Sequence, residues 1–154
     1  MEKTVKTVIL ALGSNLGNRL NTINSAIQKI ESEVGEIISI ADCIETAPFE
    51  MESVENFMNS CIEIETELTV WEVLKKLQKI EIDLGRPKNM KGKNESRTID
   101  IDIIFYDSEM IETTELCIPH KEYHTRSFVL IPLLQIAPNF IDPSKHLTVK
   151  QLIN

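Results

Sequence analysis

The spacing of hydrophobic residues along the chain predicts a succession of strands and helices. Apolar runs typical of strands occur at residues 5–12, 37–46, 59–68 and 96–107. Apolar residues three and four positions apart, typical of amphipathic helices, occur at residues 19–33 and 69–84. Thr69 and Glu72 form a capping-box pattern at the second helix start, and Gly85 stands where a helix C-cap glycine belongs.

The order of these elements favours an α+β fold. Strand, helix, strand, strand, helix and strand follow one another, which is the order of ferredoxin-like folds. Further predicted elements are a hairpin between Met110 and Ile118, a helix at residues 126–138 that is kinked or restarted at Pro132, and a short helix at residues 148–154. We therefore expect a mainly antiparallel sheet with helices packed on it, in one domain spanning residues 1–154.

Composition and charge narrow the class of protein. The chain has 154 residues, 42% of them hydrophobic and 26% charged, which suits a globular domain with its own core. Its longest apolar runs are too short to span a bilayer, and the run near the N-terminus is interpreted as a first strand rather than a secretion signal. The net charge of −8 disfavours nucleic acid as a partner. The three cysteines are widely spaced and odd in number, which fits buried thiols in a reducing cytosol.

Two carboxylates interrupt the apolar pattern of the stretch "SRTIDIDIIFYD", residues 96–107. Alternation places on one buried face Ile99, Ile101, Ile103 and Phe105. Asp100 and Asp102 share the other face, about 6.5–7 Å apart along the strand, where two ionised carboxylates repel by roughly 2.5 kcal/mol at an effective dielectric of about 20. The pair therefore predicts either a solvated face or a site for a divalent cation such as Mg²⁺, which prefers hard oxygen ligands.

A basic segment precedes this strand in an otherwise acidic chain. Residues 85–97, "GRPKNMKGKNESR", hold five basic side chains and one acid. The segment is interpreted either as a solvated loop or as a site for a polyanionic small ligand. Because it leads directly to Asp100 and Asp102, cations for phosphate and carboxylates for a metal arrive together, which is the mixture that phosphoryl transfer needs. The chain has no Walker-type loop and no Gly-x-Gly-x-x-Gly motif, so side chains would have to hold a nucleotide.

Six segments in one order carry a family resemblance and cover nearly the whole chain: "ALGSNLGNR", "ETAPFE", "FMNSCIEIET", "LQKIEIDLGR", "SRTIDIDIIFYD" and "IPHKEYHTRSFVLIPLLQIAP". With them the chain resembles the 6-hydroxymethyl-7,8-dihydropterin pyrophosphokinases of folate biosynthesis. The resemblance implies a ferredoxin-like α/β sandwich, two Mg²⁺ ions, and transfer of pyrophosphate from ATP to the pterin hydroxymethyl oxygen with AMP as the other product. We expect a cytoplasmic monomer that binds ATP and a reduced pterin, without nucleic acid or membrane partners.

The resemblance also implies roles for single residues. Asp100 and Asp102 match the metal ligands that orient the triphosphate for in-line attack on the β-phosphorus. The positions that match the pterin site are Thr46, Ala47, Phe49, Asn59 and Phe128. Among these, Phe128 would stack on the flat ring and Asn59 would hydrogen-bond its polar edge.

A second group of positions matches the part of the family's site that holds ATP. These positions are Gln78, Glu81, Arg86, Arg97, His120 and Arg126. Arg97 and Arg126 would neutralise charge that grows during transfer, and His120 would donate a hydrogen bond to a phosphate oxygen. Arg86 and Arg97 are expected to belong to the catalytic set together with the two aspartates.

The segment before Arg97 departs from the family pattern. The family carries arginine where Lys88 stands, and an Arg-Trp-Gly-Pro run where residues 93–96 read "KNES". Asn94 cannot supply the stacking area of the tryptophan that closes a loop over the pterin, so we expect weaker closure. Two other functions stay open: a non-catalytic or weakly active relative that binds nucleotide or pterin, and a metal-dependent glycosyltransferase, since those enzymes also use Asp-x-Asp.

Overall fold

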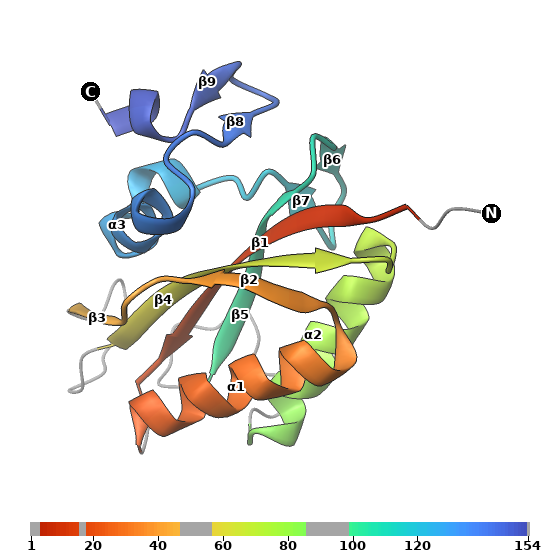
Figure 1. Cartoon of the computed structure of the whole chain (residues 1–154), viewed down its shortest axis with the longest axis vertical. Helices are drawn as coiled ribbons and strands as arrows, with labels where there is room; N and C mark the ends of the chain where they lie inside the picture. Colours follow the sequence, from red (N-terminus) through yellow and green to blue (C-terminus); the bar gives the residue numbers. More distant parts are fainter. Residues whose placement is uncertain (1–3, 16–17, 47–56, 86–98, 154) are drawn as a thin grey trace.

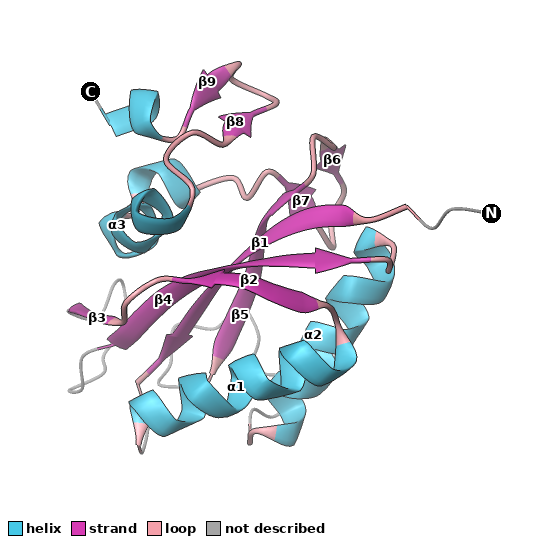
Figure 2. Ribbon diagram, in the orientation of Figure 1, coloured by secondary structure: helices cyan, strands magenta, loops and turns pink. Residues whose placement is uncertain are grey.

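An antiparallel sheet forms the centre of the molecule in the computed structural model, which describes residues 4–15, 18–46, 57–85 and 99–153 (Figures 1 and 2). Its strands are β1 (Lys6–Ser14), β2 (Glu36–Ile40), β3 (Ile44–Thr46), β4 (Phe57–Thr66) and β5 (Asp100–Tyr106). The order across the sheet is β2–β4–β1–β5, with β3 also paired to β4, and each of these pairs is antiparallel.

Helices cover both faces of this sheet. The helices α1 (Arg19–Glu33) and α2 (Val70–Asp83) lie on one face, and α3 (Ser127–Ile136) lies on the other (Figure 1). The remaining elements are β6 (Ile111–Glu112), β7 (Cys117–Ile118), β8 (Ile141–Asp142), β9 (Leu147–Thr148) and 3₁₀ turns at Tyr123–Thr125 and Lys150–Ile153. The predicted α+β architecture is confirmed, as is the hairpin that β6 and β7 form.

Local capping sets the ends of α1 and α2. The side chain of Asn18 accepts a hydrogen bond from the backbone N–H of Asn21 at the start of α1. At the start of α2, the N–H of Glu72 donates to the Thr69 hydroxyl, and the N–H of Thr69 donates to the Glu72 carboxylate. Gly85 follows α2 with a φ of 109°, a conformation that favours glycine. The capping box and the C-cap glycine predicted for this helix are therefore confirmed.

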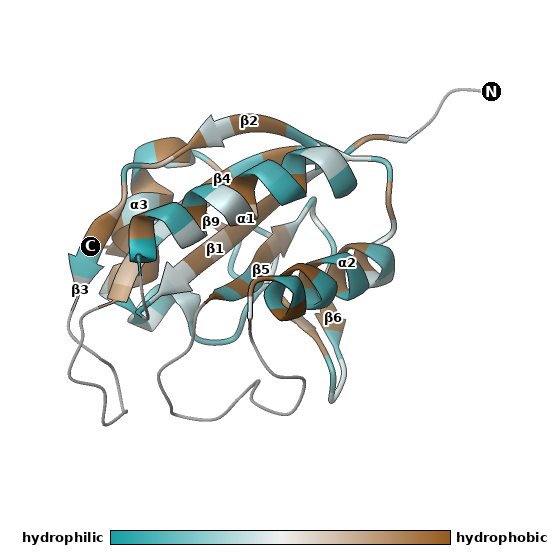
Figure 3. Cartoon of the chain, turned by 90° about the horizontal axis from the view of Figure 1, so that it is seen from below, coloured by the Kyte–Doolittle hydropathy of each residue, from teal (hydrophilic) through white to brown (hydrophobic). Residues whose placement is uncertain are grey.

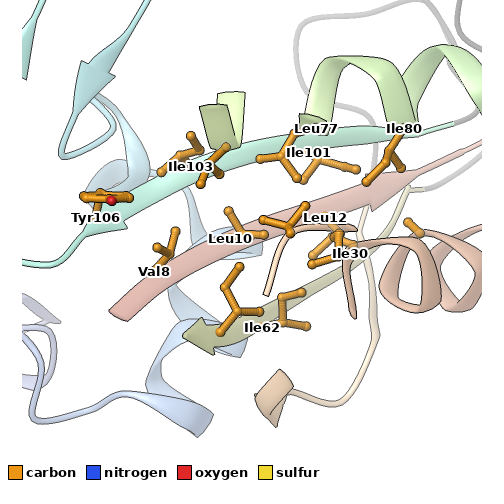
Figure 4. Close-up of a cluster of buried hydrophobic side chains, with 14 of the residues drawn as sticks. Val8, Leu10, Leu12, Ile30, Ile62, Leu77, Ile80, Ile101, Ile103 and Tyr106 are labelled. Atoms are coloured by element: carbon orange, nitrogen blue, oxygen red, sulfur yellow. The ribbon is translucent and has the colours of Figure 1, made fainter. Parts of the chain in front are cut away.

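The sheet separates two hydrophobic clusters. Val8, Leu10 and Leu12 of β1 point toward α1 and α2, whereas Ile9 packs in the cluster beneath α3. Figure 4 shows the first cluster, in which these three side chains meet others from β4, β5 and the two helices. In Figure 3, α1 and α2 lie in front of the sheet and each carries both hydrophilic and hydrophobic residues, as expected of helices with one buried face.

A β-bulge changes the alternation that the sequence predicts for β5. Leu10 pairs with Ile103 but its neighbour Ile9 pairs with Phe105, so Ile104 is an extra residue in the ladder. Phe105 consequently packs in the cluster beneath α3, while Ile101 and Ile103 face α1 and α2. The prediction that Phe105 shares their face is wrong, because one inserted residue reverses the side to which the following residue points.

Three other predicted elements differ in detail. The strand predicted at residues 37–46 is two strands, β2 and β3, both paired to β4. Ile40 pairs with Ile62 and Ile44 pairs with Asn59, so one more residue lies between the paired positions on this side than on β4. The extra residue interrupts the ladder between the two strands. The helix α3 continues through Pro132, so it does not restart there, whereas a kink at this residue stays a prediction. The last predicted helix is a 3₁₀ turn.

The predictions about cysteines and membranes have separate outcomes. All three cysteines are free, and only Cys61 is buried, while Cys43 and Cys117 are half-buried. Burial raises the pKa of the Cys61 thiol to about 12, so this thiol stays protonated. Within the described ranges, no helix combines the length and the apolar character needed to cross a membrane.

A buried carboxylate attaches the C-terminal segment to the sheet. Asp142 is fully buried and accepts hydrogen bonds from the Tyr123 hydroxyl and from the N–H and hydroxyl of Ser144. The Tyr123 ring meets Phe105 edge to face with centroids 5.0 Å apart, which connects this network to β5. Burial raises the pKa of Asp142, but the hydrogen bonds from Ser144 and Tyr123 together lower it by more than burial raises it. The net shift of this pKa is therefore downward.

We predict that Tyr123→Phe lowers the free energy of unfolding at pH 7 by about 1.5–3 kcal/mol, because a hydrogen bond to a buried charge is lost. The pKa of Asp142 is lower in the folded state, so its contribution is present above the ordinary carboxyl pKa of 3.8 and is lost as pH falls through the folded value. Urea unfolding at pH 7 and in acid should therefore show a shrinking difference between the variant and the wild type.

Tyr106→Phe is the matched control for this prediction. It also removes a buried tyrosine hydroxyl, but that hydroxyl donates to the backbone carbonyl of Leu68, which does not titrate. Its cost should be the same at both pH values. A pH-independent cost for Tyr123→Phe would contradict the account of Asp142.

Candidate active site on the α3 face of the sheet

Strand register brings the candidate residues together at one end of the sheet. On β1, Gly13 lies opposite Asn59 of β4 on one side and opposite Asp100 of β5 on the other. Two residues earlier on β1, and therefore on the same face, Ala11 lies between Cys61 and Asp102. Directly paired residues point to the same face of a sheet, and Cys61 belongs to the cluster beneath α3. Asn59 and the two aspartates therefore share the α3 face.

The two aspartates form the acidic part of this surface. Asp100 and Asp102 are both half-buried, and the side chain between them, Ile101, points into the opposite core. The prediction that the two aspartates share one face of the strand, and that Ile101 points to the opposite face, agrees with the register of β5 against β1. In the part of the chain that the structure describes, no set of three or more His, Cys, Asp or Glu side chains could hold a metal ion. Two carboxylates suit Mg²⁺, which completes its coordination with water and phosphate oxygens.

A turn after β7 brings a histidine to the same surface. The backbone N–H of His120 donates to the carbonyl of Ile104 over 3.0 Å, which fixes the residue beside β5. The His120 Nδ1 accepts a hydrogen bond from the N–H of Glu122 at 3.2 Å. The neutral ring therefore carries its proton on Nε2, the nitrogen that is free of the turn, and can donate it to a ligand.

The same turn orients an arginine at the start of α3. Arg126 donates to the Glu122 carboxylate at 2.7 Å, and its guanidinium lies 5.8 Å from the centre of the Phe128 ring. The Glu122 carbonyl accepts from the N–H and the hydroxyl of Thr125, which closes the turn. Glu122 thus contacts both residues expected to hold phosphate: His120 through its backbone and Arg126 through its side chain.

The charges around His120 show that these groups form one cluster. Burial lowers the pKa of His120, and Arg126 also lowers it, whereas Asp102, Glu122 and Asp100 raise it; the net shift is downward. A charged group affects the pKa of the ring in this way only when it lies close to it. The carboxylates of Asp100 and Asp102, the His120 ring and the Arg126 guanidinium therefore lie near one another at this end of the sheet.

Asn59 and Phe128 border the same surface. Asn59 is 5% exposed and lies beside Gly13 in the sheet. Phe128 belongs to the first turn of α3 and packs partly against the cluster beneath that helix. An amide and an aromatic ring are the two groups that recognise a flat heterocycle, the amide through hydrogen bonds to its edge and the ring through stacking.

The helix α2 holds the aspartate strand from the other side. Glu81 is only 2% exposed, and its carboxylate accepts a hydrogen bond from the backbone N–H of Ile101 at 2.7 Å. This contact ties α2 to the edge of β5 between the two aspartates. Gln78 lies one turn earlier on α2 and is exposed. Nucleotide contacts for both residues stay predictions.

The other predicted site residues are not placed on this surface. Thr46 ends β3 opposite Phe57. The others, which are Ala47, Phe49, Arg86 and Arg97, lie outside the described residues, as do Lys88 and Asn94. Sequence reasoning missed two residues, Gly13 and Glu122. Gly13 was visible as part of "ALGSNLGNR", but only strand register shows that it lies between Asn59 and Asp100.

Comparison with known proteins gives the family of the chain. Residues 9–138 match 7,8-dihydro-6-hydroxymethylpterin-pyrophosphokinase (HPPK). The chain is 41% identical over 137 residues to the 2-amino-4-hydroxy-6-hydroxymethyldihydropteridine pyrophosphokinase of Aquifex aeolicus, with 89% of this chain and 84% of that protein covered. These matches define the class of protein. The chain belongs to the 7,8-dihydro-6-hydroxymethylpterin-pyrophosphokinase family, as the sequence predicted.

Other relatives are much longer than this chain. It is 38% identical over 145 residues to the folic acid synthesis protein FOL1 of Dictyostelium discoideum, but spans only 22% of that protein. It also resembles the crystal structure of Plasmodium falciparum HPPK-DHPS with pterin and p-hydroxybenzoate, with a TM-score of 0.77 and 16% identity, covering 99% of this chain and 42% of the other. That likeness supports the fold.

We predict that Glu81→Ala speeds hydrogen exchange of the Ile101 amide and lowers the free energy of unfolding by about 1–3 kcal/mol, because a buried N–H loses this acceptor. Glu81→Gln is the matched control, since its amide oxygen can still accept. Amide exchange followed by NMR measures both effects. Unchanged protection of Ile101 in Glu81→Ala would show that α2 does not hold this strand through the carboxylate.

Proposed function

We propose that the protein transfers the terminal diphosphate of ATP to the hydroxymethyl oxygen of 6-hydroxymethyl-7,8-dihydropterin, which yields AMP and the pterin diphosphate. The observation that carries this proposal is the shared surface of Asp100, Asp102 and Asn59, with His120 and Arg126 beside it. The surface combines groups for metal, phosphate and a flat heterocycle. Relatives from Aquifex aeolicus and Porphyromonas gingivalis carry the name of this pyrophosphokinase.

The aspartates are the proposed metal ligands. Their carboxylates project from one strand to one side, and two ionised groups at about 6.5–7 Å repel each other unless a cation or water separates them. We infer that the site takes two Mg²⁺ ions together with ATP. Such ions neutralise triphosphate charge and orient the transferred group when they are bound. Asp100 and Asp102 supply anchoring oxygens, and α2 holds their strand through Glu81.

The turn at residues 120–126 supplies the phosphate contacts. Nε2–H of His120 can donate to a phosphate oxygen, because its Nδ1 is already occupied by the N–H of Glu122. Arg126 brings a planar guanidinium whose N–H groups match the geometry of phosphate oxygens. Both groups stabilise charge that builds on phosphate oxygens as the β–α bridging bond breaks. Arg86 and Arg97 are proposed to add to this set from the basic segment.

The acceptor is proposed to lie between Asn59 and the aspartates. Asn59 offers an amide donor and acceptor to the pyrimidine edge of a pterin, and Phe128 offers a ring face. Thr46, Ala47 and Phe49 are the further proposed pterin positions. In-line transfer needs the hydroxymethyl oxygen next to the metal-bound triphosphate, so the polar edge lies toward Asn59 and the hydroxymethyl group toward Asp100.

The setting we propose is a monomer in a reducing cytosol, with no nucleic acid or membrane partner. Three free cysteines and a net charge of −8 support this setting. Size-exclusion chromatography with light scattering tests the monomer, and a mass of twice 17.5 kDa would contradict it.

The decisive experiment is AMP formation from ATP, Mg²⁺ and 6-hydroxymethyl-7,8-dihydropterin by the purified protein. AMP that appears only when all three are present supports the proposed reaction. Binding of ATP or pterin without AMP above background would instead identify a non-catalytic relative. Preferential binding of UDP-sugars over ATP would identify a glycosyltransferase, the third function that Asp-x-Asp allows.

We predict that Asp100→Asn and Asp102→Asn each reduce turnover by about a thousandfold or more, because both keep the side-chain shape and remove the charge that anchors the metal. Asp107→Asn is the matched control: it makes the same change at the other end of this strand, and its φ of 52° suits asparagine. Steady-state AMP formation at saturating Mg²⁺ measures the effect. Near wild-type turnover in either variant would refute the metal assignment.

We further predict that Glu122→Gln raises the KM for ATP about two- to fivefold, because the carboxylate that orients Arg126 becomes neutral while the backbone contact to His120 remains. Glu31→Gln, an equal charge change at an exposed position of α1, should leave this KM unchanged. An unchanged or lower KM in Glu122→Gln would mean that the carboxylate does not position Arg126 for the nucleotide.

A further inference from the structure

The position of Gly13 in the site suggests a role that its backbone does not explain. Gly13 lies within the regular antiparallel ladder of β1, one residue before the strand ends. Its φ is not in the left-handed region, where Gly85 alone is found among the described glycines. An alanine could therefore adopt this backbone. What glycine provides here is the absence of a side chain at the centre of the site.

Distances around Gly13 show what uses that space. A Cβ built on Gly13 would lie 3.0 Å from Asn59 Oδ1 and 3.6 Å from Phe57 Cδ1. The first distance is shorter than ordinary van der Waals contact between carbon and oxygen. The Asn59 side-chain amide therefore lies over Gly13, against the position where any other residue would carry its Cβ.

The position of the Asn59 amide over Gly13 matters for the proposed placement of the acceptor. Asn59 and Asp100 flank Gly13 on β4 and β5, so two strand spacings, about 9.6 Å in total, separate their backbones. In the proposed reaction this row must hold a bicyclic acceptor with its polar edge at Asn59 and its hydroxymethyl group near Asp100. An amide displaced by a few tenths of an ångström would shift the acceptor relative to the triphosphate.

We propose that Gly13 is a positioning residue for acceptor recognition: by lacking a Cβ, it seats the Asn59 carboxamide over β1 in the orientation that the pterin edge requires. This inference rests on the proposed function. The neighbouring row supports it, because Ala11 carries a methyl group on the same face, where the partner is Cys61 and no amide crosses the strand. Of these two rows on β1, only the row of Asn59 therefore carries a glycine against which a side-chain amide packs.

The experiment compares Gly13→Ala, Asn59→Ala and the double variant with the wild type. Pterin binding is measured by fluorescence titration without ATP, and the KM values for pterin and ATP are measured separately. Gly13→Ala should weaken pterin binding and raise the pterin KM about tenfold or more, since small misplacements of a binding group are costly. The KM for ATP should stay within about twofold, because the ATP-side groups are contributed by other elements.

The double variant separates positioning from a general structural effect. If Gly13 acts through Asn59, adding Gly13→Ala to Asn59→Ala should change pterin binding by less than about twofold, because the displaced amide is already absent. Additive losses, or equal losses for ATP and pterin, would overturn the inference. Unchanged pterin binding in Gly13→Ala would overturn it as well.

Folding is checked by urea unfolding of each variant. If Gly13→Ala alone does not fold, the double variant should fold, because the crowded Oδ1 atom is gone; failure of the double variant to fold would contradict the proposed contact. The pterin titration needs no turnover. Absence of AMP formation in the wild type would therefore refute the proposed function without deciding the role of Gly13.

Discussion

The antiparallel register of β1 against β4 and β5 is the constraint on which the rest of the site depends. It sets Asn59, Gly13 and Asp100 in one row, and Ala11 and Asp102 in the next. Because directly paired residues point to one face, a change of register by one residue would turn the aspartates into the core of α1 and α2. Burial of Ile101 on one face thus fixes the exposure of the aspartates on the other.

Local sequence signals were sufficient for much of this fold. The capping box of Thr69 and Glu72, the glycine after α2 and the period of α1 depend on neighbours in the chain, and each was predictable. The bulge at Ile104 was not, because the sequence there continues as apolar residues that fit either face. Its side is decided by Phe105 packing against Tyr123, a contact between residues that are distant in sequence.

The site shows the same division between local and distant information. The spacing of Asp100 and Asp102 predicted their common face, and the family resemblance suggested Asn59, His120 and Arg126. The roles of Gly13 and Glu122 depend instead on register and on a folded turn, neither of which a motif describes. Motifs therefore suggest the groups proposed to meet the substrate, whereas the structure suggests which residues would orient those groups.

Charge balance indicates that the described surface alone would not suffice for the proposed triphosphate site. Around His120 lie three carboxylates, those of Asp100, Asp102 and Glu122, against the guanidinium of Arg126. A polyanion approaching this surface alone would be repelled, in a chain whose net charge is already −8. In the proposed site, metal ions on the aspartates would reverse the sign of the local field, and residues 85–97 hold five further basic side chains. In the proposed reaction, the sheet would recognise the acceptor, and charge neutralisation would require the metal ions that bind together with ATP.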